Sequence, residues 1–357
     1  MRRHTRQIQV GSLKIGGDAP VSVQTMANAD PHDAAALLGQ IREAADLGCD
    51  LVRLTVPDRE ASDTFAEVRR QSPLPLVADI HFDYRLALAA IAAGADGLRI
   101  NPGNIGGPDR VRAVVAAARE RRVPIRIGVN GGSLERDLLE KYGSATAEAL
   151  VESALRHVAL LEAEDYREIK ISVKASDVPR TIAAYRMLSA KTDYPLHLGV
   201  TEAGTFIPGT VRSSVALGTL LFEGIGDTIR VSLTDRPAQE VRVGVELLRC
   251  LGMRAPGASV TSCPTCGRTR VDVVGMANAV ETRLERFYRI HPDAPRPHVA
   301  VMGCVVNGPG EARNADIAVA GGDGFFALYL NGVLQRRVPE AETLDEIERQ
   351  VENWRKP

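Results

Sequence analysis

The sequence has few of the features that mark secreted or membrane-bound proteins. Its 357 residues include only five cysteines, an odd number with uneven spacing, which does not form a disulfide framework. No window approaches the roughly 18 consecutive apolar residues that a membrane-spanning helix needs. The basic N-terminus also lacks the apolar core of a signal peptide. We therefore expect a soluble, cytoplasmic protein with reduced thiols and no membrane partner.

An imbalance of charge is also absent. The chain carries 44 basic and 45 acidic residues, a formal net charge of −1, and no long block of one sign. Partners such as nucleic acid select a basic surface, so none is expected here and a small-molecule ligand is favoured. A GxGxxG fingerprint between a strand and a helix is missing as well, which argues against a flavin or nicotinamide bound in that way.

What the sequence does contain is a regular alternation of short β-branched runs and helix-periodic stretches between residues 20 and 251. This pattern is typical of repeated βα units around a parallel sheet. Eight such runs occur, at residues 21–26, 50–56, 75–81, 97–101, 124–130, 168–174, 195–201 and 228–233. Eight units within about 250 residues predict an α/β fold, a (β/α)8 TIM-type barrel over residues 1–251. A doubly wound open sheet is the alternative, and residues 7–15 predict a hairpin at the bottom of the barrel.

The alternation of strand-like and helix-like segments ends near residue 252, where a different kind of unit is expected to begin. Residues 252–262 are rich in glycine, proline and serine and predict a linker. Residues 263–357 predict a small α+β domain. Its expected elements are a helix near 276–290, strands near 298–303, 315–320 and 325–330, and an amphipathic helix over 342–354.

The predicted barrel strands are unusually cationic. Arginines occupy four strand interiors, and two lysines share a fifth: Arg53, Arg99, Arg126, Arg230, Lys170 and Lys174. A buried guanidinium is costly unless an anion accompanies it. Either the carboxylates of Asp79, Asp96, Asp227 and Glu202 form an ionic layer with these cations, or the barrel receives a phosphate-type ligand. For the whole set we favour the ligand, because guanidinium forks suit phosphate oxygens.

Further polar candidates lie at or after the ends of the predicted strands, where barrel enzymes gather their chemistry. They are Asp79, His81, Asn101, Asn104, Asn130, Thr201, Glu202 and Ser232. The glycine-rich segments NPGNIGG and NGGS either cradle an anion with their backbone amides or are ordinary tight turns. His197, inside an apolar strand, is interpreted as a core histidine.

The strongest motif lies in the second domain. Cys263 and Cys266 form CPTC, and Cys304 begins CVVNGPGE, which ends at Glu311. Three thiolates on two loops suit a [4Fe–4S] cluster with a fourth, oxygen ligand from Glu311. Structural zinc would need a fourth Cys or His, of which His291 and His298 are the nearer candidates, and a redox dithiol is the third alternative. Cys49 and Cys250 are interpreted as small core residues.

These segments carry a family resemblance. GGDAPVSVQTMANAD, LVADIHFDYRLAL, LRINPGNIG, IRIGVNGGSLE, VSVKASD, HLGVTEAG, SCPTCGR and GCVVNGPGEA closely resemble the 4-hydroxy-3-methylbut-2-enyl diphosphate synthases of the non-mevalonate isoprenoid pathway, in their bacterial two-domain form. The resemblance runs over essentially the whole chain. It implies an oxidoreductase that converts 2-C-methyl-D-erythritol 2,4-cyclodiphosphate into the linear allylic diphosphate, consuming two electrons and releasing water.

The resemblance also implies roles for single residues. Cys263, Cys266 and Cys304 would ligate a [4Fe–4S] cluster, Glu311 would be its fourth ligand in the resting state, and Glu202 would be the acid near the leaving hydroxyl. The implied substrate-binding residues are Arg53, His81, Arg99, Arg126, Asn130, Lys174, Thr201, Arg230 and Ser232. Reduced flavodoxin or ferredoxin is implied as electron donor, and the implied assembly is a homodimer in which one chain's cluster domain caps its partner's barrel.

Two rival readings follow from the residues alone. A phosphosugar aldolase would use Lys170 or Lys174 as a Schiff base and hold zinc in its C-terminal domain, but this leaves Glu311 without a role. A redox-sensing or RNA-binding metal module is disfavoured by the neutral net charge and by the lack of an aromatic and basic strand motif. Iron in the purified protein would separate the first reading from the resemblance.

Overall fold

The computed structural model describes residues 2–101, 103–255, 257–304, 310 and 312–355. Glu311 lies outside these residues, so its predicted role as a ligand stays a prediction. The chain forms two compact units, Met1–Arg254 and Ala255–Pro357, which are described one at a time. Among the described helices, none has the length and apolar character needed to cross a bilayer.

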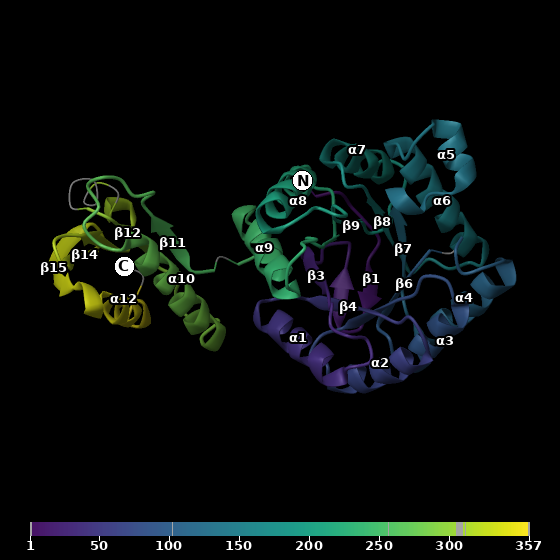
Figure 1. Ribbon diagram of the computed structural model, residues 1–357, viewed down its shortest axis with the longest axis horizontal. Coiled ribbons are helices and arrows are strands. Elements are labelled where there is room, and N and C mark those ends of the chain that lie inside the picture. The colour runs from purple at the N-terminus through teal and green to yellow at the C-terminus, as the bar shows by residue number, and fades with distance from the viewer. Residues whose placement is uncertain (1, 102, 256, 305–309, 311, 356–357) are drawn as a thin grey trace. The chain divides into compact units, whose positions relative to one another are not determined.

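The first unit is a ring of eight parallel strands (Figure 1). The strands are β3 Ser22–Met26, β4 Leu51–Thr55, β5 Leu76–Asp79, β6 Gly97–Ile100, β7 Ile125–Asn130, β8 Ile169–Lys174, β9 His197–Leu198 and β10 Thr228–Ile229. They pair in the order β8-β7-β6-β5-β4-β3-β10-β9, and a parallel bridge between Ile171 and Leu196 joins the two ends. All eight predicted strands are present, and the ring confirms the barrel over the open sheet.

Helices cover the outside of the ring. They are α1 Ala34–Asp46, α2 Arg59–Gln71, α3 Tyr84–Ala92, α4 Pro108–Arg121, α5 Arg136–Tyr142, α6 Ala147–Ala163, α7 Val178–Ser189, α8 Phe206–Phe222 and α9 Pro237–Cys250. Several begin just after a strand with an aspartate cap: Asp33, Asp58 and Asp83 each accept a backbone N–H of the following helix. These caps fix the loops that follow the strands.

Alternation along the strands decides which side chains enter the barrel. On β7, Ile125, Ile127 and Val129 are buried in the hydrophobic core between strands and helices. Since side chains of a strand alternate between its two faces, Arg126 and Gly128 point to the inside. The apolar core that holds the barrel together therefore lies outside the ring, and the inside is left for polar residues.

A hairpin closes one end of the barrel, as predicted. Strands β1 Ile8–Val10 and β2 Leu13–Ile15 pair antiparallel. Ile8, Val10 and Ile15 pack with Leu51 and Val77, near the starts of their strands. This plug is apolar, so chemistry is expected at the opposite end, where the strands finish.

The described residues of the second unit include a five-stranded mixed sheet and two long helices. Its elements are β11 Ser259–Ser262, α10 Val273–Ile290, β12 His298–Met302, β13 Ile317–Gly321, β14 Phe325–Leu330, β15 Val333–Pro339 and α12 Thr343–Glu352. The order is β11-β12-β13-β14-β15, with the first three strands parallel. Leu284 of α10 and Ile347 of α12 pack on Val299, Val319 and Leu328 in one core. The small α+β domain is confirmed.

Two of its strands were not expected from the sequence. β11 lies inside residues 252–262, so four residues of the segment expected as a linker belong to the sheet of the second unit. Its residues, SVTS, show no apolar alternation. β15 has mostly exposed side chains because it lies at the edge of the sheet. Both strands form through backbone pairing with a neighbour, which a hydrophobic pattern does not report.

Candidate functional site

A row of charged side chains crosses four neighbouring strands inside the barrel. The register sets Asp79 of β5 opposite Arg99 of β6, Arg99 opposite Arg126 of β7, and Arg126 opposite Lys170 of β8. All four side chains are buried. Three cations therefore lie level with one carboxylate, and the row has an excess of positive charge.

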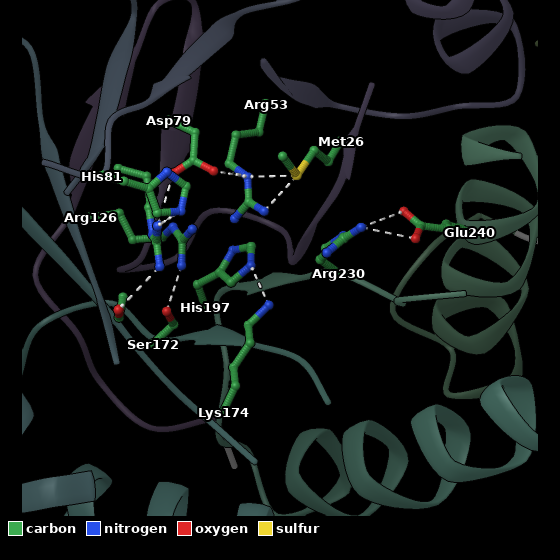
Figure 2. A network of polar contacts seen from close by, with 12 residues as sticks. Met26, Arg53, Asp79, His81, Arg126, Ser172, Lys174, His197, Arg230 and Glu240 are labelled. Atoms are coloured by element: carbon green, nitrogen blue, oxygen red, sulfur yellow. Dashed lines mark hydrogen bonds and ion pairs between the residues drawn. The ribbon is translucent and has the colours of Figure 1, made fainter. Parts of the chain in front are cut away.

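Asp79 is the carboxylate that two arginines share (Figure 2). Arg99 Nη1 donates to Asp79 Oδ1 at 3.1 Å, and Arg53 Nε lies 3.5 Å from Oδ2. Burial opposes ionisation of Asp79, but the charges of Arg53 and Arg99 lower its pKa below the ordinary value. Arg99 Nη1 also lies 2.9 Å from Nε2 of His81. His81, Arg99 and Arg53 are thus brought together around one charge.

Arg53 has a weak second partner. Its Nε and Nη2 lie 3.2 and 2.6 Å from Sδ of Met26, a poor hydrogen-bond acceptor. Burial lowers the pKa of Arg53 to about 10, against the opposing pull of Asp79. Arg53 thus shares the carboxylate of Asp79 with Arg99, and its other partner is a thioether. Its guanidinium therefore remains available to an anionic ligand.

Arg126 and Lys174 have even fewer partners. Arg126 Nη1 donates to Ser172 Oγ at 2.5 Å, while its Nε and Nη2 are buried with no hydrogen bond to the described residues. Lys174 Nζ lies 3.3 Å from Nε2 of His197, which is also fully buried. Burial lowers the pKa of both cations, and the charges of neighbouring arginines lower it further. A bound anion would supply the counter-charge that these side chains lack.

The ionic layer considered from the sequence is only partly present. Asp79 pairs with strand arginines, but Asp96 pairs with Arg69 and Asp227 with Arg2. Arg230 has a partner that the sequence reasoning missed: its Nη2 lies 3.0 Å from Oε1 of Glu240, on α9. The signal available in the sequence was an acid in the first turn of the helix that follows the Arg230 strand.

Two inward-facing glycines make room for the cations. A Cβ at Gly128 would lie 2.7 Å from Arg99 Nε, and a Cβ at Gly199 would lie 2.5 Å from Lys174 Nζ. Neither distance is compatible with an alanine in an unchanged structure. The absence of a side chain at these positions therefore belongs to the site.

The remaining predicted residues lie at the rim, where the strands end. Asn130 is opposite Lys174 in the β7–β8 pairing, and Thr201 N donates to Ala175 O at 3.1 Å. Ser232 follows β10 and is half-buried. Glu202 is exposed and has φ of 53°, a left-handed conformation that is uncommon for a residue with a side chain. Such strain is frequent at functional positions.

The cysteine segment of the second unit begins where β11 and β12 end. Cys263 N donates to Val301 O at 3.2 Å, and Gly303 N donates to Cys263 Sγ at 3.2 Å. Cys266 follows Thr265, which has φ of 64°, and is exposed. Cys304 comes two residues after β12 and is half-buried. Two candidate ligands, Cys263 and Cys304, thus follow adjacent parallel strands.

Within the described ranges, no three His, Cys, Asp or Glu side chains gather closely enough to form a metal-binding group. The donor set itself fits a cluster, because it offers thiols on two neighbouring loops of one sheet. The assignment of these cysteines as ligands stays a prediction.

Comparison with known proteins agrees with this arrangement over the whole length. The family profile described as the GcpE TIM-barrel domain matches residues 5–245, and that of the GcpE protein C-terminal domain matches residues 259–353. The chain belongs to the GcpE family. A protein of Geobacter sulfurreducens named 4-hydroxy-3-methylbut-2-en-1-yl diphosphate synthase (flavodoxin) is 57% identical over 352 residues, which cover 99% of this chain and 98% of that protein. A protein of Ruminiclostridium cellulolyticum with the same name is 51% identical and covers 98% of both chains.

Solved structures show the fold of the first unit alone. A 3-dehydroquinate dehydratase from Geobacillus kaustophilus matches with a TM-score of 0.51 and 16% identity, over 70% of this chain and 99% of that one. The family profiles and the relatives confirm the family resemblance seen in the sequence. The cationic strand residues singled out from the sequence include Arg53, Arg99 and Arg126, which lie close together inside the barrel. Of the rim residues, Asn130 is paired with Lys174 across β7 and β8, and Ser232 lies two residues after Arg230.

Proposed function

We infer that this GcpE-family enzyme performs the reaction in its relatives' name, forming 4-hydroxy-3-methylbut-2-en-1-yl diphosphate from 2-C-methyl-D-erythritol 2,4-cyclodiphosphate. The carbon–oxygen bond that closes the ring at phosphate opens, one hydroxyl leaves as water, and two electrons are consumed. The observation that supports a site inside the barrel is a set of buried cations with fewer anionic partners than positive charges.

The cations account for binding of the diphosphate. Arg53, Arg99, Arg126, Lys174 and Arg230 would surround the phosphate oxygens. Arg126 Nε and Nη2, which have no hydrogen bond to the described residues, can donate to them. Ring opening adds negative charge to the phosphate that leaves carbon. Fixed cations in a water-poor site stabilise that charge without having to reorganise.

The rim residues would handle the carbon skeleton and its hydroxyl groups. Glu202 is exposed at the end of the barrel where the strands finish. Proton delivery to the leaving hydroxyl is the role we assign to it. Thr201, Asn130 and Ser232 are proposed to position the same substrate by hydrogen bonds.

The cofactor we propose is a [4Fe–4S] cluster held by Cys263, Cys266 and Cys304, with Glu311 as fourth ligand. Such a cluster supplies single electrons and an iron that acts as a Lewis acid. Two features of the chain support this proposal: Gly303 N donates to Cys263 Sγ, and β11, which precedes Cys263, pairs with β12, which precedes Cys304.

Three further proposals concern the surroundings of the enzyme. The relatives' name supports flavodoxin as the electron donor, and ferredoxin is the other candidate. A homodimer in which one chain's cluster domain caps its partner's barrel stays a prediction from the family resemblance. So does a cytoplasmic location.

The test is turnover of the cyclodiphosphate by anaerobically purified protein with a reduced flavodoxin, together with iron and sulfide analysis. We expect about four irons per chain and formation of the linear diphosphate in the wild type. Cys304→Ser should lose both, whereas Cys250→Ser, at an exposed cysteine on the barrel unit, should keep both.

One zinc per chain and no turnover would overturn the proposal and favour the aldolase reading. Borohydride trapping of a carbonyl substrate on Lys170 or Lys174 would then be the positive sign of that alternative.

A further inference from the structure

Glu240 is a buried carboxylate that connects three elements beside the barrel mouth. It lies in the first turn of α9, where the helix dipole favours a negative charge. Thr25 Oγ1 of β3 donates to its Oε2 at 2.8 Å, and Leu233 N donates to its Oε1 at 3.0 Å. Only 4% of the residue is exposed. Its position is therefore fixed by its own hydrogen bonds.

The remaining partner of Glu240 is Arg230, one of the proposed diphosphate ligands. Arg230 Nη2 lies 3.0 and 3.3 Å from the two carboxylate oxygens. Arg230 Nε is buried without a hydrogen bond to any described residue. Glu240 therefore holds the guanidinium through Nη2 alone, and Nε can still donate to another ligand. Figure 2 shows Glu240 reaching Arg230 from the side opposite Lys174 and His197.

Arg230 needs such a tether because it has room to move. A cavity of about 340 Å³ borders it, lined also by Met26, Thr55 and Asp235. A long side chain next to open space loses rotamer entropy when a ligand fixes it. Arg53 and Arg99, by contrast, are held by Asp79.

Glu240 also holds the backbone next to a second proposed ligand. Its bond to Leu233 N lies one residue after Ser232. The same carboxylate thus fixes the chain that follows β10 on both sides of Val231, at Arg230 and beside Ser232.

We propose that Glu240 is a positioning residue for substrate binding, which holds Arg230 and the segment around Ser232 in the geometry that receives the diphosphate. The inference rests on the proposed function, since it assumes that Arg230 and Ser232 bind this ligand. Glu240 also borders the cavity next to Arg230, and the role proposed for it is to act on the substrate through Arg230.

The change in pyrophosphate affinity of Glu240→Gln has opposite signs if Glu240 positions Arg230 and if it only balances its charge. If Glu240 only neutralised Arg230, Glu240→Gln would leave a more cationic site, and inorganic pyrophosphate would bind more tightly. If it positions Arg230, the same variant should bind pyrophosphate about tenfold more weakly, because a charge-assisted tether is lost. We would measure the dissociation constant by isothermal titration at constant ionic strength, on the full chain purified anaerobically.

The matched control is Glu246→Gln, an exposed acid on the same helix, which should leave pyrophosphate affinity and iron content unchanged. Turnover provides the second readout: Glu240→Gln should raise KM for the cyclodiphosphate by a larger factor than it lowers kcat. If Glu240→Gln does not fold, Thr25→Val tests the same tether and should weaken pyrophosphate binding about threefold.

Unchanged or tighter pyrophosphate binding by a folded Glu240→Gln protein would overturn the inference. If that variant does not fold, unchanged binding by Thr25→Val would do so. Failure of the wild type to bind pyrophosphate would instead contradict the proposed function, so the two failures are distinguishable.

Discussion

The barrel interior and the cysteine segment of the second unit differ in how completely the chain itself arranges their side chains. Inside the barrel, Arg99 is held by Asp79 and lies beside His81, and Gly128 leaves it space. At the end of β11, Cys263 receives one backbone hydrogen bond, and Cys266 is exposed. Among the described residues, the fold thus holds the cations of the proposed anion site in place before any ligand binds. For the proposed cluster site, we expect the bound metal to complete the arrangement of the cysteines.

Arg126 should show the largest effect on anion binding, because it lies buried inside the barrel with two nitrogens that have no hydrogen bond to a described residue. Arg126→Met should weaken pyrophosphate binding about 100-fold, because the buried fork with two unpartnered nitrogens is removed. Iron content should not change, since the substitution lies in the barrel unit. Isothermal titration and iron analysis of the same preparation measure both quantities.

Arg242→Met is the matched control, at an exposed arginine of α9. It should leave pyrophosphate affinity unchanged. Equal losses in the two variants would show that net charge, and not the buried site, governs anion binding.

A substitution at Lys170 measures how much a buried cation inside the barrel lowers the free energy of unfolding. Burial lowers its pKa from 10.5 to about 7. Between these values the unfolded chain binds a proton that the folded chain does not, so the free energy of unfolding rises with pH in this window, and below it the cost is fully present. Lys170→Met should therefore stabilise the barrel by about 2 kcal/mol at pH 7, with a smaller gain near pH 10.

Urea unfolding followed by circular dichroism at the two pH values measures this gain. A loss of stability at pH 7, or a gain that does not shrink as the pH rises, would contradict a protonation cost at Lys170.

The space left by Gly199 should also matter for pyrophosphate binding, by a smaller factor than Arg126. In Gly199→Ala the new Cβ would meet Lys174 Nζ at 2.5 Å and the carbonyl oxygen of Arg230 at 2.9 Å. The lysine end can move, but the backbone oxygen cannot do so cheaply, and we expect about tenfold weaker pyrophosphate binding. Gly218→Ala, with its nearest neighbour at 3.7 Å, is the control that should bind normally.

The smallest expected effect concerns the second unit alone. Asp272 caps α10 by accepting from Gly275 N at 2.8 Å. Asp272→Ala should lower the stability of this unit by about 1 kcal/mol and leave pyrophosphate affinity unaltered. Fluorescence of Trp354, the single tryptophan, follows unfolding of this unit. A matching loss in pyrophosphate binding would mean that the two units are not independent.

The sequence predicted the barrel well because its strands are buried and apolar on one face. The run IRIGVN shows the alternation directly, with isoleucine and valine outward and Arg126 inward. β11 and β15 were missed because they pair by their backbones and bury few apolar side chains. Hydrogen bonding to a neighbouring strand leaves no periodic trace in composition.

The site was predictable to a similar extent and for a related reason. Arginine inside an apolar strand is conspicuous, so the cations were found from the sequence. Their partners were harder, because Glu240 lies on a helix and reaches Arg230 only through the fold. His197 was interpreted as a core histidine; it is buried, and its Nε2 also lies beside Lys174.

The central claim is that the barrel binds the diphosphate by itself, while the cysteines hold the redox cofactor. Pyrophosphate titration of Cys304→Ser tests it most directly. We predict a protein without iron that binds pyrophosphate within about twofold of the wild type. A Cys304→Ser protein that has lost its iron and no longer binds pyrophosphate would contradict the claim, because the barrel would then not suffice as the anion site.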